Sequence, residues 1–260
     1  MTRMIPIRAG ILGGLFLAAG CPSSQTAGSD AALPDGAPGP DAAADGAGGP
    51  WRHTILIDGV NDFELAETFS TTTAGYAAYI TWDADNLYVG YSGIDIAVDA
   101  PDSETKWVLV YVDLDPEVLE GGGAPVGERY NTQEPDFPSA FAPEHYYRWK
   151  SNDSFEGLRS WTGTGWTDTA IATDAAVTGE FMELALPRST LGTLPSFAGV
   201  VTLMVNEKDL AEWTYAGLYD GSFTDGYFDA DVAAIPITRW LRVDFSATLP
   251  PTDPSHMRGD

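Results

Sequence analysis

The chain has 260 residues, of which 44% are hydrophobic and 12% aromatic, so it can bury a core of one sizeable or two small domains and is not disordered throughout. Its formal net charge is −25 at pH 7. That charge repels polyanions, so we expect no nucleic-acid partner. One cysteine cannot close an intramolecular disulfide, and one cysteine with three histidines is too few for a Cys/His zinc cluster.

The first twenty residues have the layout of a secretory signal peptide. Arg3 and Arg8 precede an eleven-residue apolar stretch over 9–19, which is too short to span a bilayer. The stretch ends in Leu17-Ala18-Ala19-Gly20-Cys21, which resembles the lipobox of bacterial lipoproteins, with alanine at the position that usually holds leucine.

The lipobox resemblance implies that residues 1–20 are removed and that Cys21 is lipidated. The alternative is a free thiol beside an ordinary cleavage site. Pro22, and not an aspartate, follows Cys21. By similarity to sorted lipoproteins, this implies the bacterial outer membrane, with the protein facing the periplasm or the cell exterior. The lipid anchor is the only membrane contact that we expect.

Residues 21–50 are predicted to form a disordered stalk. They contain eight alanines, six glycines and five prolines, and no aromatic residue. Such a segment cannot bury enough apolar surface to fold. We therefore place the folded domain at 51–248 and a polar tail at 249–260.

The folded domain shows the pattern of an all-β protein. Short apolar runs recur between turn residues, and sustained helical spacing is almost absent. A hairpin is predicted over 76–91, where alternating apolar residues flank a turn at Asp83 to Asn86. The predicted strands are 54–57, 76–82, 87–91, 107–112, 145–149, 158–161, 166–172, 181–186, 200–205, 213–218 and 240–245. Roughly ten strands of this kind indicate a two-sheet antiparallel β-sandwich.

Three segments carry a family resemblance. They are Ile57-Asp58-Gly59 followed by Asp62, the hairpin sequence over 78–89, and Gly179-Glu180-Phe181-Met182-Glu183-Leu184-Ala185-Leu186-Pro187. Together they resemble family 9 carbohydrate-binding modules and their relatives in the DOMON-like superfamily. The resemblance spans about 57–245 and implies an immunoglobulin-like β-sandwich, commonly a sugar-binding accessory domain and sometimes with bound calcium.

Aromatic residues near predicted loops are the candidate carbohydrate-binding residues, because sugar rings stack their C–H faces on exposed aromatic planes. Trp161 and Trp166 flank a glycine-containing turn that would place both indoles near a loop tip. Trp149 precedes this hairpin, and Trp213 and Tyr215 lie in a second loop-rich stretch. The alternative is that these rings cover the ends of the core.

The candidate metal ligands are Asp113 and Asp115, with calcium as the expected ion. They are two residues apart at the end of a predicted central strand, so their side chains point the same way. Calcium takes six to eight oxygen ligands from converging carboxylates and carbonyls. With 38 acidic residues in the chain, a solvated acidic surface is the alternative.

No motif of a hydrolase, phosphate loop or metalloprotease is present, so we expect no enzyme activity. The sequence favours a membrane-anchored lipoprotein that binds a polysaccharide or other glycan without cleaving it. The alternative is a structural or protein-interaction sandwich without a sugar ligand, which could depend on calcium.

Overall fold

The computed structural model describes residues 49–259, except 119–120, 131–132, 153–154, 171–172, 192–195, 208–212 and 219–232. The predicted signal peptide, Cys21 and almost all of the stalk lie outside the described residues. Within the described part, no helix is long and apolar enough to cross a membrane. Fifteen strands and five short 3-10 helices make up the regular structure there.

The first sheet has five antiparallel strands in the order β1-β2-β3-β10-β9. Their bounds are β1 (Thr68–Ser70), β2 (Ala77–Trp82), β3 (Asn86–Ser92), β9 (Asp174–Thr178) and β10 (Phe181–Pro187). The predicted hairpin over 76–91 is confirmed as β2 and β3, since Trp82 pairs with Leu87. Asp83 closes its turn by accepting hydrogen bonds from the backbone N–H groups of Asp85 and Asn86.

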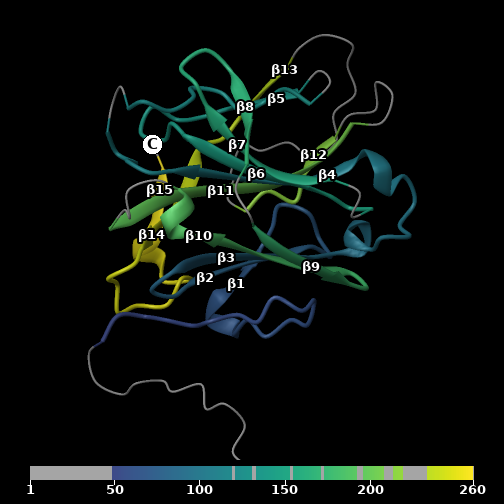
Figure 1. Cartoon of the computed structure of the whole chain (residues 1–260), viewed down its shortest axis with the longest axis horizontal. Coiled ribbons are helices and arrows are strands. Elements are labelled where there is room, and N and C mark those ends of the chain that lie inside the picture. The colour runs from purple at the N-terminus through teal and green to yellow at the C-terminus, as the bar shows by residue number, and fades with distance from the viewer. Residues whose placement is uncertain are drawn as a thin grey trace, which may run out of the picture. The chain divides into compact units, whose positions relative to one another are not determined.

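The second sheet follows the order β15-β14-β11-β4-β6-β7-β8, and β12 also pairs with β11. Its strands are β4 (Lys106–Asp113), β6 (His145–Lys150), β7 (Glu156–Trp161), β8 (Trp166–Thr169), β11 (Phe197–Asn206), β12 (Trp213–Tyr215), β14 (Arg239–Asp244) and β15 (Met257–Gly259). Figure 1 shows the two sheets as stacked layers. The predicted all-β, two-sheet antiparallel sandwich is thus confirmed.

A third, two-stranded sheet was not predicted. It pairs β5 (Gln133–Asp136) with β13 (Ala233–Pro236) in parallel, and both strands are short and contain proline. The 3-10 helices lie in connections: η1 (Leu65–Glu67), η2 (Ile94–Ile96), η3 (Ser103–Thr105), η4 (Arg188–Thr190) and η5 (Pro254–His256).

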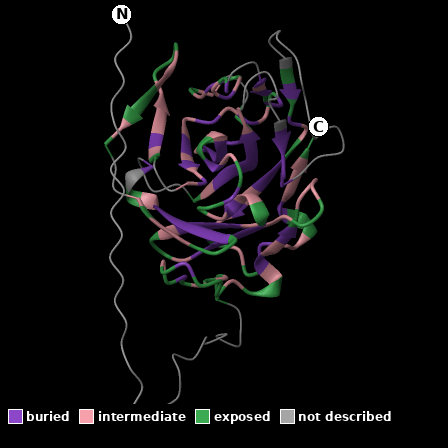
Figure 2. Cartoon of the chain, turned by 90° about the vertical axis from the view of Figure 1, so that its right-hand side faces the viewer, coloured by how far each residue is buried: buried purple, intermediate pink, exposed green. Residues whose placement is uncertain are grey.

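The main core fills the space between the two sheets. Ile80, Trp82 and Leu184 from the first sheet pack with Val110, Trp149 and others from the second, all fully buried. The outer face of the second sheet is covered as well, by an aromatic cluster that includes Tyr111, Phe141 and Trp240. Buried residues therefore occur on both faces of the second sheet. Figure 2 shows that the buried part of the chain is concentrated in the middle of the domain.

The N-terminal segment 51–67 covers the outer face of the first sheet. The predicted strand at 54–57 is wrong, because this segment bonds mainly to side chains and not to a neighbouring strand. The buried Glu183 of β10 accepts hydrogen bonds from the backbone N–H groups of Asp58 and Gly59, each at 2.7 Å. Gly59 has a φ of +83°, and a Cβ there would lie 2.5 Å from the Thr178 hydroxyl oxygen, so this turn requires glycine.

The predicted polar tail at 249–260 is corrected. Its residues 257–259 form β15, which extends the second sheet by pairing with β14. His256 is 5% exposed and packs edge-on against Trp82 at 5.9 Å between ring centroids. Strand β15 is the last strand of this sheet in the described part of the chain, so one of its sides has no neighbouring strand.

Candidate functional site

The antiparallel register of β6, β7 and β8 gathers a set of side chains on the outer face of the second sheet. Trp161 of β7 lies opposite Trp166 of β8. Two residues along each strand, Arg159 lies opposite Asp168. Residues two apart in a strand share a face, so these four side chains emerge together. We call the set of Arg148, Phe155, Arg159, Trp161, Trp166 and Asp168 the β6–β8 platform.

The two indoles of the platform form a contacting pair. Their ring centroids are 5.4 Å apart at an interplanar angle of 61°, and both residues are half-buried. Trp166 also packs edge-on against Tyr146 at 4.9 Å, so the aromatic cluster beneath holds it in place. Among the described residues, Trp166 is the aromatic ring that Trp161 contacts.

Charged groups lie beside the tryptophan pair. Arg159 donates a hydrogen bond to the Trp166 carbonyl at 2.9 Å and forms an ion pair with Glu128. Arg148 stacks over Phe155, with its guanidinium carbon 4.2 Å from the ring centroid. Phe155 is 41% exposed, so the far end of the platform also offers an aromatic ring.

Gly157 leaves a gap in the middle of the platform. It lies opposite Arg148 on the same face, between Phe155 and Arg159 along the chain. A Cβ at this position would meet no heavy atom within 4 Å. From Phe155 to Trp161 the strand runs about 20 Å, at about 3.3 Å per residue. The platform therefore has an aromatic ring at each end of a span long enough for several sugar rings, with open space at Gly157 between them.

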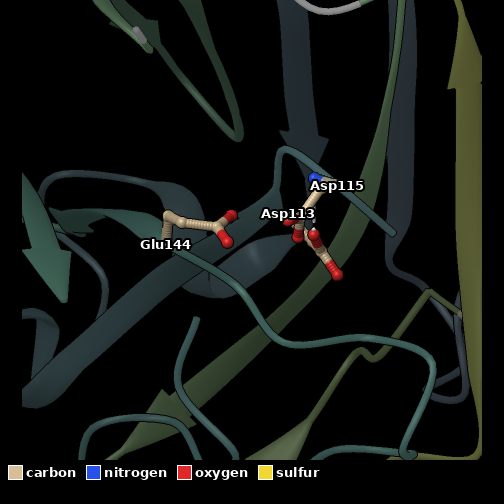
Figure 3. Close-up of side chains that lie close together, drawn as sticks. All are labelled: Asp113, Asp115 and Glu144. Carbon is tan, nitrogen blue, oxygen red and sulfur yellow. Dashed lines mark hydrogen bonds between the residues drawn. The ribbon is translucent and has the colours of Figure 1, made fainter. Parts of the chain in front are cut away.

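The predicted metal ligands Asp113 and Asp115 are joined by Glu144, which lies just before β6. One oxygen from each of the three carboxylates lies within 4.8 Å of the others. Figure 3 shows the Glu144 carboxylate pointing toward the two aspartates. Asp113 is 1% exposed, and its two oxygens accept hydrogen bonds from the Ala142 and Asp115 backbone N–H groups.

Burial first of all, together with the nearby charges of Glu144 and Asp115, raises the pKa of Asp113 to about 7 against the opposing backbone hydrogen bonds. Burial also raises the pKa of Glu144. Three ionised carboxylates this close repel one another, so the cluster takes up either a proton or a cation. Carboxylate oxygens are ligands that calcium prefers.

The acidic cluster and the tryptophan pair lie in one cross-strand row. Extending the β4–β6 register by one position sets Asp113 opposite Glu144. The backbone N–H of Trp161 donates to the carbonyl oxygen of Glu144 at 2.8 Å. The sequence presented the sugar-binding and the metal-binding residues as separate candidates. In the structure, Trp161 and Trp166 are neighbours of the acidic cluster in a row that crosses the strand ends of the second sheet.

Other predicted sugar-binding residues lie elsewhere. Trp149 is fully buried in the main core, and Tyr215 is 6% exposed with its hydroxyl donating to Asp95 at 3.0 Å. Neither ring offers a face to a ligand, because the inner face of the second sheet packs against the first. Both are therefore corrected to core residues. Trp213 belongs to β12, but its side chain lies outside the described residues.

A separate groove of about 610 Å³ lies beside β9, lined in part by Ile55, Leu56, Tyr88 and Asp174. Tyr88 is 3% exposed, and its hydroxyl donates to Asp83 at 2.7 Å. Its ring is therefore not available for stacking. Since the β6–β8 platform exposes aromatic rings, it is the better candidate for a sugar site.

Comparison with known proteins gave structural similarities alone. No family model matches the chain, and no curated protein matches it. Among the similar solved structures are two of carbohydrate-binding modules of family 9 from Caldicellulosiruptor kristjanssonii. The module in complex with cellotriose is 14% identical in sequence to this chain, with a TM-score of 0.40. The match covers 71% of this chain and 90% of the module. The module in complex with glucose is also 14% identical, with a TM-score of 0.37. That match covers 66% of this chain and 84% of the module. The DOMON-like assignment stays a prediction.

Proposed function

We propose that the protein is a lipid-anchored glycan-binding protein that holds its sugar on the β6–β8 platform without cleaving it. The observation that carries this proposal is the half-buried Trp161–Trp166 pair in register with Arg159 and Asp168 on the outer face of the second sheet. Aromatic planes flanked by side chains that donate and accept hydrogen bonds are the chemistry that sugar rings need.

Binding is tested by titrating the detergent-solubilised full chain against a panel of glycans. Trp161→Ala is expected to weaken binding about tenfold or more, because it removes the stacking ring at one end of the platform; a tenfold loss corresponds to about 1.4 kcal/mol. Trp161→Phe, which keeps an aromatic plane, is the matched variant and retains most of the affinity. Binding that is equally strong in Trp161→Ala would refute the platform as the site.

If no glycan binds a cooperatively folded protein, the alternative of a structural or protein-interaction sandwich is favoured. The acidic cluster supports a calcium-dependent form of either function. We propose that Asp113, Asp115 and Glu144 hold calcium, with further oxygens from backbone carbonyls and water, since the three carboxylates alone supply too few ligands.

For the anchor, we propose lipidation of Cys21 in the bacterial outer membrane, on the strength of the lipobox resemblance and the glycine-, alanine- and proline-rich segment that follows. Two or more acyl chains hold a protein stably on a membrane. Cys21→Ser is expected to move the protein from the membrane fraction to the soluble fraction and to remove the acyl mass seen by mass spectrometry. An unacylated wild-type protein would contradict this assignment.

A further inference from the structure

The platform gathers basic side chains on a strongly acidic protein. Three of the 13 lysine and arginine residues of the chain, Arg148, Lys150 and Arg159, lie on β6 and β7 with their side chains on the outer face. Lys150 stacks on Trp107 with its Nζ 4.8 Å from the ring centroid. Glu128 and Asp168 are the carboxylates that pair with the two arginines. Three cations therefore meet two carboxylates here, on a chain whose net charge is −25.

Two of these cations converge on one carboxylate oxygen. Arg148 Nη2 lies 3.1 Å and Arg159 Nε 3.2 Å from the same Oδ1 atom of Asp168. The arginine side chains are only 15% and 14% exposed, whereas that of Asp168 is 74% exposed. The guanidinium groups are therefore held in place, while the carboxylate between them is open to solvent.

Because its side chain is 74% exposed, Asp168 can leave the pair and become hydrated, while an incoming carboxylate restores a partner for the two largely buried guanidinium groups. A ligand carboxylate can therefore take the place of the Asp168 carboxylate at small cost and gain two guanidinium partners, whose planar donors suit a carboxylate. Nε of Arg148 and Nε1 of Trp166 are buried without a hydrogen-bond acceptor among the described residues. These uncompensated N–H groups add to the positive potential of the platform.

The spacing matches a sugar acid. Arg159 and Trp161 are two residues apart on the same strand face, which is about 7 Å. A pyranose ring stacked on Trp161 would therefore extend its ring substituent toward Arg159 and the position of the Asp168 carboxylate.

We infer that the glycan bound on the β6–β8 platform carries carboxylates, as in a uronic acid polymer, and that Arg148 and Arg159 bind them. This inference rests on the proposed function. Asp168 then competes with the ligand carboxylate for Arg148 and Arg159, so removal of the Asp168 charge strengthens binding.

The test uses the detergent-solubilised full chain in EDTA and oligosaccharides of polygalacturonate, alginate and hyaluronan, each paired with its carboxyl methyl ester. At least one free acid is expected to bind about tenfold or more tightly than its ester. The double variant Arg148→Gln/Arg159→Gln is expected to abolish this difference, and Asp168→Asn to increase affinity for the acid several-fold. Arg239→Gln, at an exposed arginine of β14, serves as the control and leaves binding unchanged.

Equal binding of acid and ester, lost in Trp161→Ala, would overturn the inference and leave the proposed function standing. Binding of neutral oligosaccharides together with no binding of the three acidic ones would likewise overturn the inference and leave the proposed function standing. Comparable binding of dextran sulfate would also overturn it, because attraction would then be to any polyanion. If no glycan of any kind binds, the proposed function and this inference fail together.

Discussion

Between pH 5 and pH 8 in calcium-free buffer, the free energy of unfolding is expected to fall by about 2.5 kcal/mol more in the wild-type protein than in the Asp113→Asn variant. The pKa of Asp113 is about 7 in the folded protein because of burial, against roughly 3.9 in an unfolded chain. Between these values the folded state binds more protons than the unfolded state. Stability therefore declines as the pH rises through this window.

Chemical denaturation at both pH values measures this difference, and the range stays above the isoelectric point of about 4.1. The variant also loses an acceptor for one of two backbone N–H groups, but that loss is similar at both pH values. His145, whose pKa burial lowers, contributes with the opposite sign in both proteins and cancels in the comparison. Parallel pH profiles of the two proteins would show that Asp113 ionises normally.

Calcium is expected to replace the proton at high pH. At pH 8, 10 mM calcium should stabilise the wild-type protein by about 1.4 to 2.7 kcal/mol, for dissociation constants typical of extracellular sites. The gain should shrink at pH 5, where protons compete, and should be absent in Asp113→Asn. A gain of the same size in the variant would place calcium elsewhere.

Trp149→Ala is expected to lower the free energy of unfolding by about 3 to 5 kcal/mol, because it removes a fully buried indole and leaves a cavity between the sheets. Trp161→Ala is the matched control at a half-buried position and should cost under about 1 kcal/mol. Urea denaturation of both variants gives the comparison. If the two tryptophans cost the same, the division between core and platform would be wrong.

The strongly patterned strands were predictable from the sequence. Each of β2, β3, β4, β6, β10 and β11 lies within a few residues of its predicted bounds, since each carries a run of alternating or continuous apolar residues that periodicity detects. Short strands such as β1, β5 and β15 have too few residues to show a period. Their pairing depends on long-range partners, for example β14 for the C-terminal strand.

The same reasoning explains what was missed at the site. Arg159 and Asp168 could have been placed beside the tryptophans, because they stand two residues away from Trp161 and Trp166 across the same hairpin. Glu144 could not, because its place beside Asp113 depends on the register of β4 against β6, some thirty residues apart in the chain. Trp149 and Trp161 lie on opposite faces of one sheet, and hydrophobicity alone does not tell these faces apart.

The N-terminal segment has a mechanical consequence. Trp51 donates its backbone N–H to Ala247 at 2.5 Å and its indole N–H to Thr81 at 3.2 Å, and the next bond along the segment joins His53 to Trp82 at 3.0 Å. A mechanical force applied through the residues before Gly49 would act first on the hydrogen bonds of Trp51 and then on the bond of His53. Under such a force, we expect segment 51–67 to detach first and to expose the outer face of the first sheet to solvent. The β6–β8 platform on the second sheet should stay folded.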